Sequence, residues 1–270
     1  MYNVGIIGNG FVGGAVAHGL SAASTGSCNV LIYDKDPSKT IDSLDQVVNR
    51  SDFVFVTVPT PMQEGGGINL NIIFSVFEDI TKCSTNRDTI FILKSTVIPG
   101  TTELLKKKYP KLNIIFNPEF LTERTARLDF INQDRIILGG VMSSVERVES
   151  LYKNRFKSCR IIKTNPITAE LLKYFSNVFF SVKISFANEM KMVCEKIGAE
   201  WPDALSGFVA DGRVADSHLN VPGPDGKLGF GGKCFPKDIN AFISFAESVG
   251  VEVNTIKGAW KTNTKVRPNE

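Results

Sequence analysis

The chain has 270 residues, of which 43% are apolar and 22% are charged, and its formal net charge is +3. That composition is typical of an ordinary soluble globular protein, and so small a net charge gives no support to a nucleic-acid partner. No apolar run approaches the roughly 18 residues of a transmembrane helix, and the N-terminus has neither the basic nor the apolar segment of a secretion signal, so we expect no membrane association.

The cysteine and histidine content indicates the compartment and limits the metal chemistry. Cysteines stand at positions 28, 83, 159, 194 and 234, form no CxxC pair and are odd in number. This usage favours a reducing compartment, and we predict a cytoplasmic protein. Because the only histidines are His18 and His218, we expect no metal site.

Short β-branched runs alternate with helical stretches in the first half of the chain. Continuous apolar strands separated by helices indicate a parallel sheet that is covered on both faces. Residues 1–164 therefore predict an α/β domain with a Rossmann-like, doubly wound parallel sheet. Strands are predicted at 2–7, 29–33, 52–58, 88–93, 112–116 and 135–138, with helices such as 69–81 and 101–108 between them.

A glycine-rich turn follows the first predicted strand and opens a helix. Gly8, Gly10 and Gly13 permit a tight turn, the approach of a pyrophosphate and close helix–strand packing, and the helix N-terminus offers amide donors. The second strand leads to Asp34, whose carboxylate can accept both ribose hydroxyls and would repel a 2′-phosphate. We therefore predict that NAD is the cofactor, with a glycine-rich turn that binds no ligand as the alternative.

One long helix is predicted where the second domain begins, at residue 165. Asn165 reads as an N-cap and Pro166 as the first helical residue, and no helix breaker follows before Gly198. Further apolar residues lie off its main stripe, which suggests a central spine or a subunit interface, although the pattern equally fits an internal helix. The stripe itself consists of Leu171, Phe175, Val178, Val182, Phe186, Met190, Val193 and Ile197.

The rest of residues 165–270 completes an all-helical second domain. A polar loop rich in glycine and proline runs from 211 to 236, and another helix is predicted at 238–249, followed by a short tail. The segment GFGGKCFPKD, residues 229–238, displays Cys234 directly after glycines that let a backbone approach a ligand closely. By the residues alone, this thiol is either incidental to a flexible loop or a nucleophile held against a substrate.

Polar residues gather where predicted parallel strands end. Residues 58–61 (VPTP) and 94–96 (KST) end the third and fourth strands, and 117–123 (NPEFLTE) follow the fifth. Ligands of open α/β sheets bind at such ends. On the long helix, Lys173 and Asn177 are four residues apart and share a face. Each of these features alone is common on protein surfaces, but their coincidence indicates a site.

These motifs resemble those of the UDP-glucose/GDP-mannose dehydrogenases, and within that family the enzymes that act on UDP-glucose. The resemblance spans nearly the whole chain, and its last three motifs are highly specific. The motifs are GNGFVG (8–13), VPTP (58–61), KST (94–96), NPEFLTE (117–123), ELLKYFSNVFFSVKISFANE (170–189), SHLNVPGPDG (217–226) and GFGGKCFPKD (229–238).

The resemblance implies a reaction and a nucleophile. Members of the family oxidise the C6 alcohol of the sugar to a carboxylate with two NAD per turnover, here UDP-glucose to UDP-glucuronate. Cys234 would form a thiohemiacetal with the intermediate aldehyde and then a thioester. Asp238 would orient water and the thiol, and Glu119 would act as an acid or base. Thr96 would position the water, and Lys173 and Asn177 would hold the oxygen on C6.

The resemblance also implies binding positions. The residues matched to cofactor contacts are Val12, Asp34, Lys39, Thr60, Thr96, Glu123 and Lys237, beside Gly8, Gly10 and Gly13. Those matched to the nucleotide sugar are Glu119, Phe120, Leu121, Glu123, Lys173, Asn177, Gly223, Pro224, Asp225, Gly226, Lys227 and Gly231.

Two departures from the family affect what we expect of the substrate. The loop that usually lies between the second and third strands is reduced to 40–51, and a third α/β domain that grips the uridine diphosphate normally follows AWKTN at 259–263. We therefore expect a short form, be it naturally short, a fragment or half of a split enzyme. The diphosphate would be held by the 211–227 loop or by a second subunit. Arg213 is the candidate contact, with an exposed surface arginine as the alternative, and we predict a homodimer.

Three other functions remain open. The chain could act on another nucleotide sugar, such as UDP-N-acetylmannosamine or GDP-mannose. It could be a two-electron dehydrogenase of the β-hydroxyacid type, since those enzymes also join a Rossmann domain to a helix with a Lys/Asn pair but need no cysteine. It could also be a non-catalytic nucleotide-binding protein with a regulatory role.

Overall fold

A computed structural model describes residues 1–22 and 28–268, and the chain divides into two compact units. The first unit consists of Met1–Pro61 and Asn69–Lys173, and the second of Met62–Ile68 and Tyr174–Glu270. The chain passes to the second unit and back around Met62–Ile68, and passes to it again inside α8 (Pro166–Ile197), the longest helix among the described residues. Within the described residues, no helix is long and apolar enough to cross a membrane.

The first unit is built on a seven-stranded sheet that confirms the predicted α/β class. All neighbours are parallel except β5 and β6, which pair antiparallel through Phe116 and Gly139. An antiparallel neighbour begins at the edge where β5 ends, so the connection between these two strands needs no full crossover. The order is β2 (Cys28–Tyr33), β1 (Tyr2–Ile7), β3 (Phe53–Val56), β4 (Ile90–Leu93), β5 (Asn113–Phe116), β6 (Arg135–Gly139) and β7 (Arg160–Thr164).

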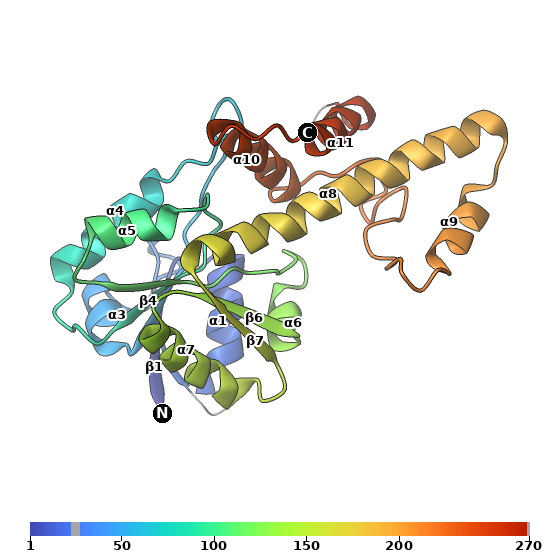
Figure 1. Cartoon of the computed structure of the whole chain (residues 1–270). Coiled ribbons are helices and arrows are strands. Elements are labelled where there is room, and N and C mark those ends of the chain that lie inside the picture. The colour runs from blue at the N-terminus through green and yellow to red at the C-terminus, as the bar shows by residue number, and fades with distance from the viewer. Residues whose placement is uncertain (23–27, 269–270) are drawn as a thin grey trace. The chain divides into compact units, whose positions relative to one another are not determined.

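Helices cover both faces of this sheet (Figure 1). Alternate residues of β3 point to opposite faces, and both sets are apolar and buried: Phe53 and Phe55 on one face, Val54 and Val56 on the other. This explains why the strands read as continuous apolar runs. The first face carries α1 (Phe11–Leu20), α6 (Ala126–Ile131) and α7 (Met142–Arg155), and the second carries α3 (Leu44–Arg50), α4 (Asn71–Cys83) and α5 (Thr101–Lys108).

The long helix α8 has the predicted bounds. The side-chain oxygen of Asn165 accepts a hydrogen bond from the Thr168 amide at 2.8 Å, Pro166 is the first helical residue, and Gly198 follows the last one with φ +76°. These are the N-cap and the terminating glycine that the sequence predicted.

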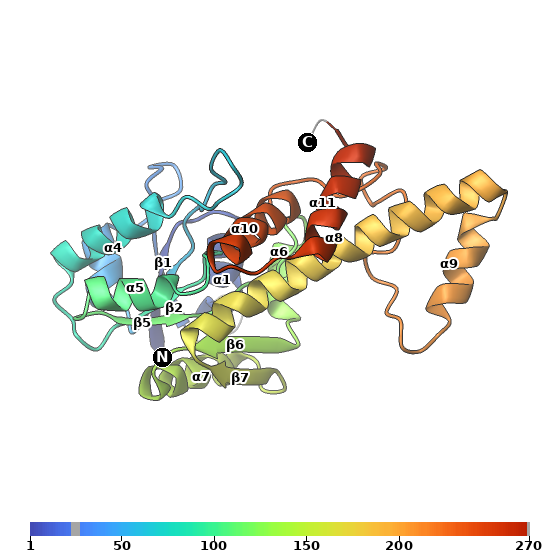
Figure 2. The same cartoon turned by 45° about the horizontal axis from the view of Figure 1, so that its top comes forward.

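The second unit packs three more helices around the later part of α8 (Figure 2). They are α9 (Trp201–Val209), α10 (Phe235–Ser248) and α11 (Asn254–Val266). The last of them corrects the prediction of a short tail after residue 249: its apolar residues Ile256, Ala259 and Trp260 pack with Phe230 and Ile239 in one cluster. The predicted helix at 238–249 begins earlier, at Phe235.

Candidate active site

The glycine-rich loop after β1 has the geometry of a ligand cradle. Gly8 has φ +96° and donates its amide to the Tyr33 carbonyl at 2.9 Å. The loop therefore lies at the carboxyl end of β1, which stands between β2 and β3 in the sheet. A Cβ atom at Gly13 would lie 2.0 Å from the carbonyl oxygen of Gly8, so only glycine fits there. A Cβ atom at Gly10 would meet nothing within 4 Å, which leaves the helix N-terminus open.

Asp34 lies directly beside this loop. Its Oδ2 accepts a hydrogen bond from the Asn9 amide at 2.6 Å, and its Oδ1 accepts one from the Asp36 amide at 2.8 Å. Lys39 is exposed and pairs with Asp36 at 3.4 Å. A bare backbone loop at a helix N-terminus with one carboxylate at its side fits a dinucleotide with an unphosphorylated ribose. Gly8, Gly10, Gly13 and Asp34 are the residues that would hold it.

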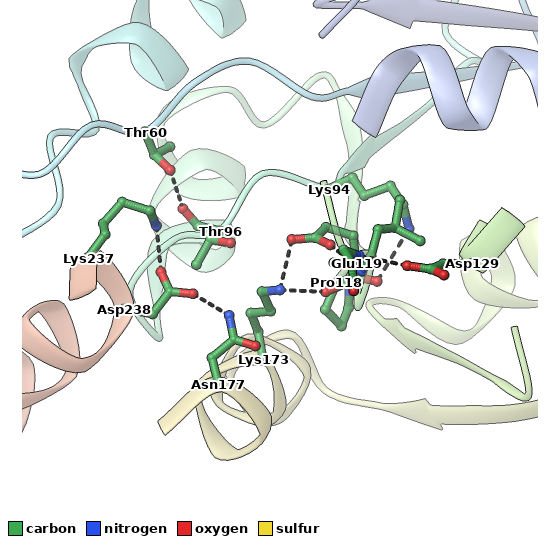
Figure 3. A network of polar contacts seen from close by, with 12 residues as sticks. Thr60, Lys94, Thr96, Pro118, Glu119, Asp129, Lys173, Asn177, Lys237 and Asp238 are labelled. Atoms are coloured by element: carbon green, nitrogen blue, oxygen red, sulfur yellow. Dashed lines mark hydrogen bonds and ion pairs between the residues drawn. The ribbon is translucent and has the colours of Figure 1, made fainter. Parts of the chain in front are cut away.

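A buried ion pair joins α8 to the segment that follows β5 (Figure 3). Lys173 Nζ donates to Glu119 Oε1 and to the Glu119 carbonyl oxygen, both at 2.8 Å, and the two side chains are only 4% and 7% exposed. Glu119 Oε2 accepts a further bond from the Leu121 amide at 2.7 Å, and Lys173 Nζ lies 5.7 Å from the centre of the Phe120 ring.

The charge of the Glu119 carboxylate follows from these contacts. Burial by itself raises its pKa, but the charge and hydrogen bond of Lys173, the Leu121 amide and the charge of Lys94 together outweigh burial, so that the net pKa is lowered. Glu119 is therefore ionised at neutral pH and can accept a proton.

Lys94 supports the same segment from inside the sheet. Its Nζ donates to Asn117 Oδ1 at 2.9 Å and to the Pro118 carbonyl at 3.3 Å, and Tyr152 Oη donates to the same Asn117 oxygen at 2.5 Å. Burial lowers the pKa of Lys94 to about 7; Glu119 opposes this shift and Lys173 adds to it. The motifs alone predict no separate role for Lys94, although a lysine directly after the apolar strand IFIL needs buried partners, and this position is a signal in the sequence.

The low pKa of Lys94 predicts a pH-dependent stability. In the unfolded chain this lysine keeps its proton up to about pH 10.4, whereas in the folded chain it loses it near 7. Between these values the unfolded state binds more protons, so stability rises with pH. The unfolding free energy of the unaltered chain, relative to Lys94→Met, should increase by roughly 2 kcal/mol between pH 6 and 9. Urea unfolding of both proteins at both pH values measures this, and a pH-independent difference would contradict it.

Two predicted threonines meet at the carboxyl ends of β3 and β4. Thr60 Oγ1 donates to the Thr96 carbonyl at 2.8 Å, and Thr60 is buried while Thr96 is half-buried. The loops that follow these strands are thereby fixed to each other. Of the other predicted positions in this unit, Val12 is half-buried in the first turn of α1, Leu121 is half-buried, and Glu123 is exposed.

In the second unit, Asn177 and Asp238 form a buried polar pair (Figure 3). Asn177 Nδ2 donates to Asp238 Oδ2 at 2.5 Å, and Lys237 Nζ lies 2.5 Å from Asp238 Oδ1. Asn177 is 8% and Asp238 1% exposed. The carboxylate is thus fixed through both oxygens, although α8 and α10 are far apart in sequence.

Cys234 is the N-cap residue of α10. Its carbonyl accepts the first helical hydrogen bond, from the Asp238 amide at 2.8 Å, and the residue is half-buried. Helix N-termini are among the positions where reactive cysteines occur in proteins. The nucleophilic role of Cys234 stays a prediction.

The loop before Cys234 contains the remaining predicted contacts. Gly223 donates its amide to the Lys227 carbonyl at 2.8 Å, and Gly226 has φ +75°, which closes the turn that also contains the exposed Pro224. Asp225 pairs with Arg267 at 2.8 Å, and Gly231 is half-buried.

Arg213 lies on the surface of the second unit. Its side chain is 89% exposed and pairs with Asp211 at 2.5 Å. A contact with a diphosphate would therefore have to compete with the Asp211 carboxylate. The binding role of Arg213 stays a prediction.

Two domains of one protein family match the chain. Residues 39–156 match the NAD binding domain of the UDP-glucose/GDP-mannose dehydrogenase family, and residues 167–265 match its central domain. The first match confirms NAD as the cofactor predicted from the glycine-rich loop.

Curated relatives agree with these matches. A UDP-glucose 6-dehydrogenase of Rickettsia typhi is 39% identical over 223 residues, which cover 80% of this chain and 50% of the relative. One from Bacillus subtilis is 33% identical and covers 82% of this chain and 50% of the relative. The chain thus spans about half the length of these relatives.

Solved structures share the fold. A UDP-glucose dehydrogenase from Pyrobaculum islandicum superposes with a TM-score of 0.85 at 29% identity, over 98% of this chain and 68% of that one. A UDP-D-ManNAc dehydrogenase from Pyrococcus horikoshii superposes with a TM-score of 0.82 at 23% identity, over 98% of this chain and 68% of that one.

Proposed function

The chain belongs to the UDP-glucose/GDP-mannose dehydrogenase family, and we propose that it oxidises UDP-glucose to UDP-glucuronate with NAD. The observation that carries this proposal is Cys234 at the N-terminus of α10, one turn before the buried Asp238. A dehydrogenase that stops at an aldehyde needs no thiol, whereas oxidation to a carboxylate gains from covalent capture of that aldehyde.

The reaction removes four electrons from the C6 alcohol. One alcohol, two NAD and one water give one carboxylate, two NADH and three protons. The glycine-rich loop and Asp34 would hold NAD, which would serve as the hydride acceptor for both oxidations when bound. The protein itself must bind the C6 oxygen, hold the aldehyde and deliver the water.

Cys234 holds the aldehyde in the proposed mechanism. Its thiolate attacks the aldehyde carbon to form a carbon–sulfur bond, and the resulting thiohemiacetal is oxidised to a thioester. Water then adds to the thioester carbonyl and loses its protons, and the carbon–sulfur bond breaks. The products are the carboxylate and the Cys234 thiolate. Asp238, fixed by Asn177 and Lys237, orients the attacking water and the thiol.

Lys173 stabilises the negative charge on the C6 oxygen, and Glu119 accepts the proton of the attacking water. The ammonium group of Lys173 stabilises negative charge on the C6 oxygen, with Asn177 as a second donor from the same helix. Glu119 is ionised at neutral pH, so it can take a proton from the attacking water. Thr96 positions that water.

One assay tests the proposed function against its alternatives. The purified chain is incubated with NAD and a panel of nucleotide sugars, while NADH absorbance and products are followed. UDP-glucose should yield two NADH and one carboxylate per sugar. A preference for another nucleotide sugar would change the substrate, and one NADH per substrate would indicate a two-electron dehydrogenase. Nucleotide binding without NADH would support a non-catalytic protein.

The position of Asp34 predicts the choice between NAD and NADP. A 2′-phosphate would meet this carboxylate, so kcat/KM should be at least about tenfold higher with NAD, the effect of roughly 1.4 kcal/mol of repulsion. Asp34→Ala should reduce that preference and retain activity with NAD. Steady-state kinetics with both cofactors measure it, with Asp36→Ala as the matched control. Equal efficiency of the two cofactors in the unaltered chain would refute the prediction.

We further propose that the chain forms a homodimer through α8. Part of the predicted stripe is exposed although it is apolar, and an uncovered row of this kind is typical of a subunit interface. The uncovered row consists of five stripe residues, Phe175, Phe186, Met190, Val193 and Ile197, together with the exposed Phe179, which lies off the stripe.

Charge placed on this row should separate the subunits. Phe179, which is 59% exposed, is the position to change, and Leu128 on α6, at 61%, offers a matched control. We expect Phe179→Glu to be monomeric and Leu128→Glu to remain dimeric in size-exclusion chromatography with light scattering. A monomeric unaltered chain at assay concentration would overturn the proposed dimer.

A further inference from the structure

Two buried asparagines hold the backbone just before the cysteine loop. Asn188 Oδ1, on α8, accepts a hydrogen bond from the Gly229 amide at 3.1 Å. Asn263, on α11, accepts one from the Phe230 amide at 2.7 Å and donates one to the Phe230 carbonyl at 3.0 Å. Asn188 is 2% and Asn263 1% exposed. We call these two residues the amide pair.

The backbone approaches the amide pair so closely that the sequence there is constrained. Gly229 has φ +66°, and a Cβ atom on it would lie 2.4 Å from Asn263 Oδ1. Phe230 is 3% exposed, and its ring lies 6.2 Å from those of both Phe235 and Trp260. The Asn263 amide accepts from the Phe230 amide with Oδ1 and donates to the Phe230 carbonyl with Nδ2, so its two ends satisfy both backbone groups.

The helix α11 carries Asn263, and Arg267, its C-cap residue, pairs with Asp225 at 2.8 Å. Elsewhere along α11, Ser185 Oγ of α8 donates to the Ala259 carbonyl at 2.7 Å, a hydrogen bond that involves no residue of the loop. In Figure 2, α11 is seen beside α8. The segment from Asp225 to Phe230 is thus attached to α11 at both of its ends.

We propose that Asn188 and Asn263 are positioning residues for Cys234, an inference that rests on the proposed role of that thiol. Between Phe230 and Cys234 the chain contains Gly231 and Gly232, whose backbone is permissive, and Gly232 has φ +78°. Such a loop is defined only if both of its ends are held. The helix α10 holds the end that contains Cys234, and the amide pair holds the other.

The experiment compares variants that differ in whether they touch the loop. Asn263→Ala and Asn188→Ala remove the hydrogen bonds to Phe230 and Gly229. Ser185→Ala is the matched control, because it removes an equally buried α8–α11 hydrogen bond that does not involve the loop. Two variants of the amide pair are made so that failure of one to fold leaves the other.

Four quantities are measured for each variant: kcat, KM for NAD, the melting temperature, and the alkylation rate of Cys234 by iodoacetamide. Peptide mass spectrometry reads the alkylation rate, with the half-buried Cys83 and Cys159 as internal references. For both amide-pair variants we expect kcat to fall roughly 10- to 100-fold, the scale of a misplacement of about 1 Å, with KM for NAD unchanged. Alkylation of Cys234 should become several-fold faster relative to the two references, since a released loop exposes the thiol.

Two outcomes would overturn the proposal. One is that Ser185→Ala lowers kcat and raises alkylation as much as Asn263→Ala does, since the effect would then be general destabilisation. The other is that both amide-pair variants retain the kcat and the alkylation rate of the unaltered chain. Failure of the proposed function itself is distinguishable: alkylation would rise without loss of kcat, and Cys234→Ala would remain active.

Discussion

Replacement of Cys234 with alanine is expected to abolish conversion of the nucleotide sugar to the carboxylate. Without the thiol, neither the thiohemiacetal nor the thioester can form, and the aldehyde is not held for the second oxidation. Loss of a catalytic nucleophile lowers kcat by roughly 10⁴- to 10⁶-fold. Quantification of NADH and of the carboxylate measures the loss. Cys159→Ala, which removes another half-buried cysteine, is the control and should retain full turnover.

The Cys234→Ser variant gives a more specific result. Serine can form an ester-like adduct with the oxidised sugar, but that adduct hydrolyses far more slowly than a thioester. We therefore expect a trapped covalent species, detected by intact-protein mass spectrometry as the added mass of the sugar nucleotide. Steady formation of carboxylate by Cys234→Ala would show that the thiol is not the nucleophile.

The sheet and the long helix could be predicted because their signals are local. The strands of the first unit are apolar, β-branched runs, and α8 has both its N-cap and its terminating glycine in the sequence. The strand β7 and the helix α11 lacked such signals. The sequence of β7 is RIIKT, with two apolar residues at the sheet edge, and α11 places the polar Asn263 on its buried face. A buried asparagine weakens the apolar periodicity by which a helix is recognised.

The site residues, too, could be predicted where their signal is local and not where it depends on a distant partner. Asp34 was identified because it follows a strand, and that position is sufficient to place it beside the glycine-rich loop. Lys94, Asn188 and Asn263 were missed because each is explained by a partner distant in sequence. Cys234 is prominent in its motif, but its predicted role follows from the family resemblance, since residue spacing does not show what a thiol faces.

The buried pair of Lys173 and Glu119 leads to the second large effect. In Lys173→Met the stem of the side chain remains but the charge is lost, and with it the group that would stabilise negative charge on the C6 oxygen. We expect turnover to fall by roughly 10²- to 10⁴-fold, the scale of one preorganised charged donor. Lys191→Met removes an exposed ion pair with Glu195 from the same helix and should leave turnover unchanged.

The unfolding free energy of the single and double variants distinguishes the catalytic role of Lys173 from a structural one. Lys173→Met leaves the Glu119 carboxylate buried without its partner, which should cost roughly 3–5 kcal/mol of unfolding free energy. The pKa of Glu119 should rise as well, because burial raises it and the opposing charge of Lys173 is gone. In the double variant Lys173→Met, Glu119→Gln the buried carboxylate is gone, and Lys94, whose pKa is already lowered to about 7, can lose its proton, so most of the stability should return. Its turnover should stay as low as that of Lys173→Met, as measured by urea unfolding and NADH formation on the same preparations. A double variant that regained both stability and turnover would show that the pair only holds the fold together.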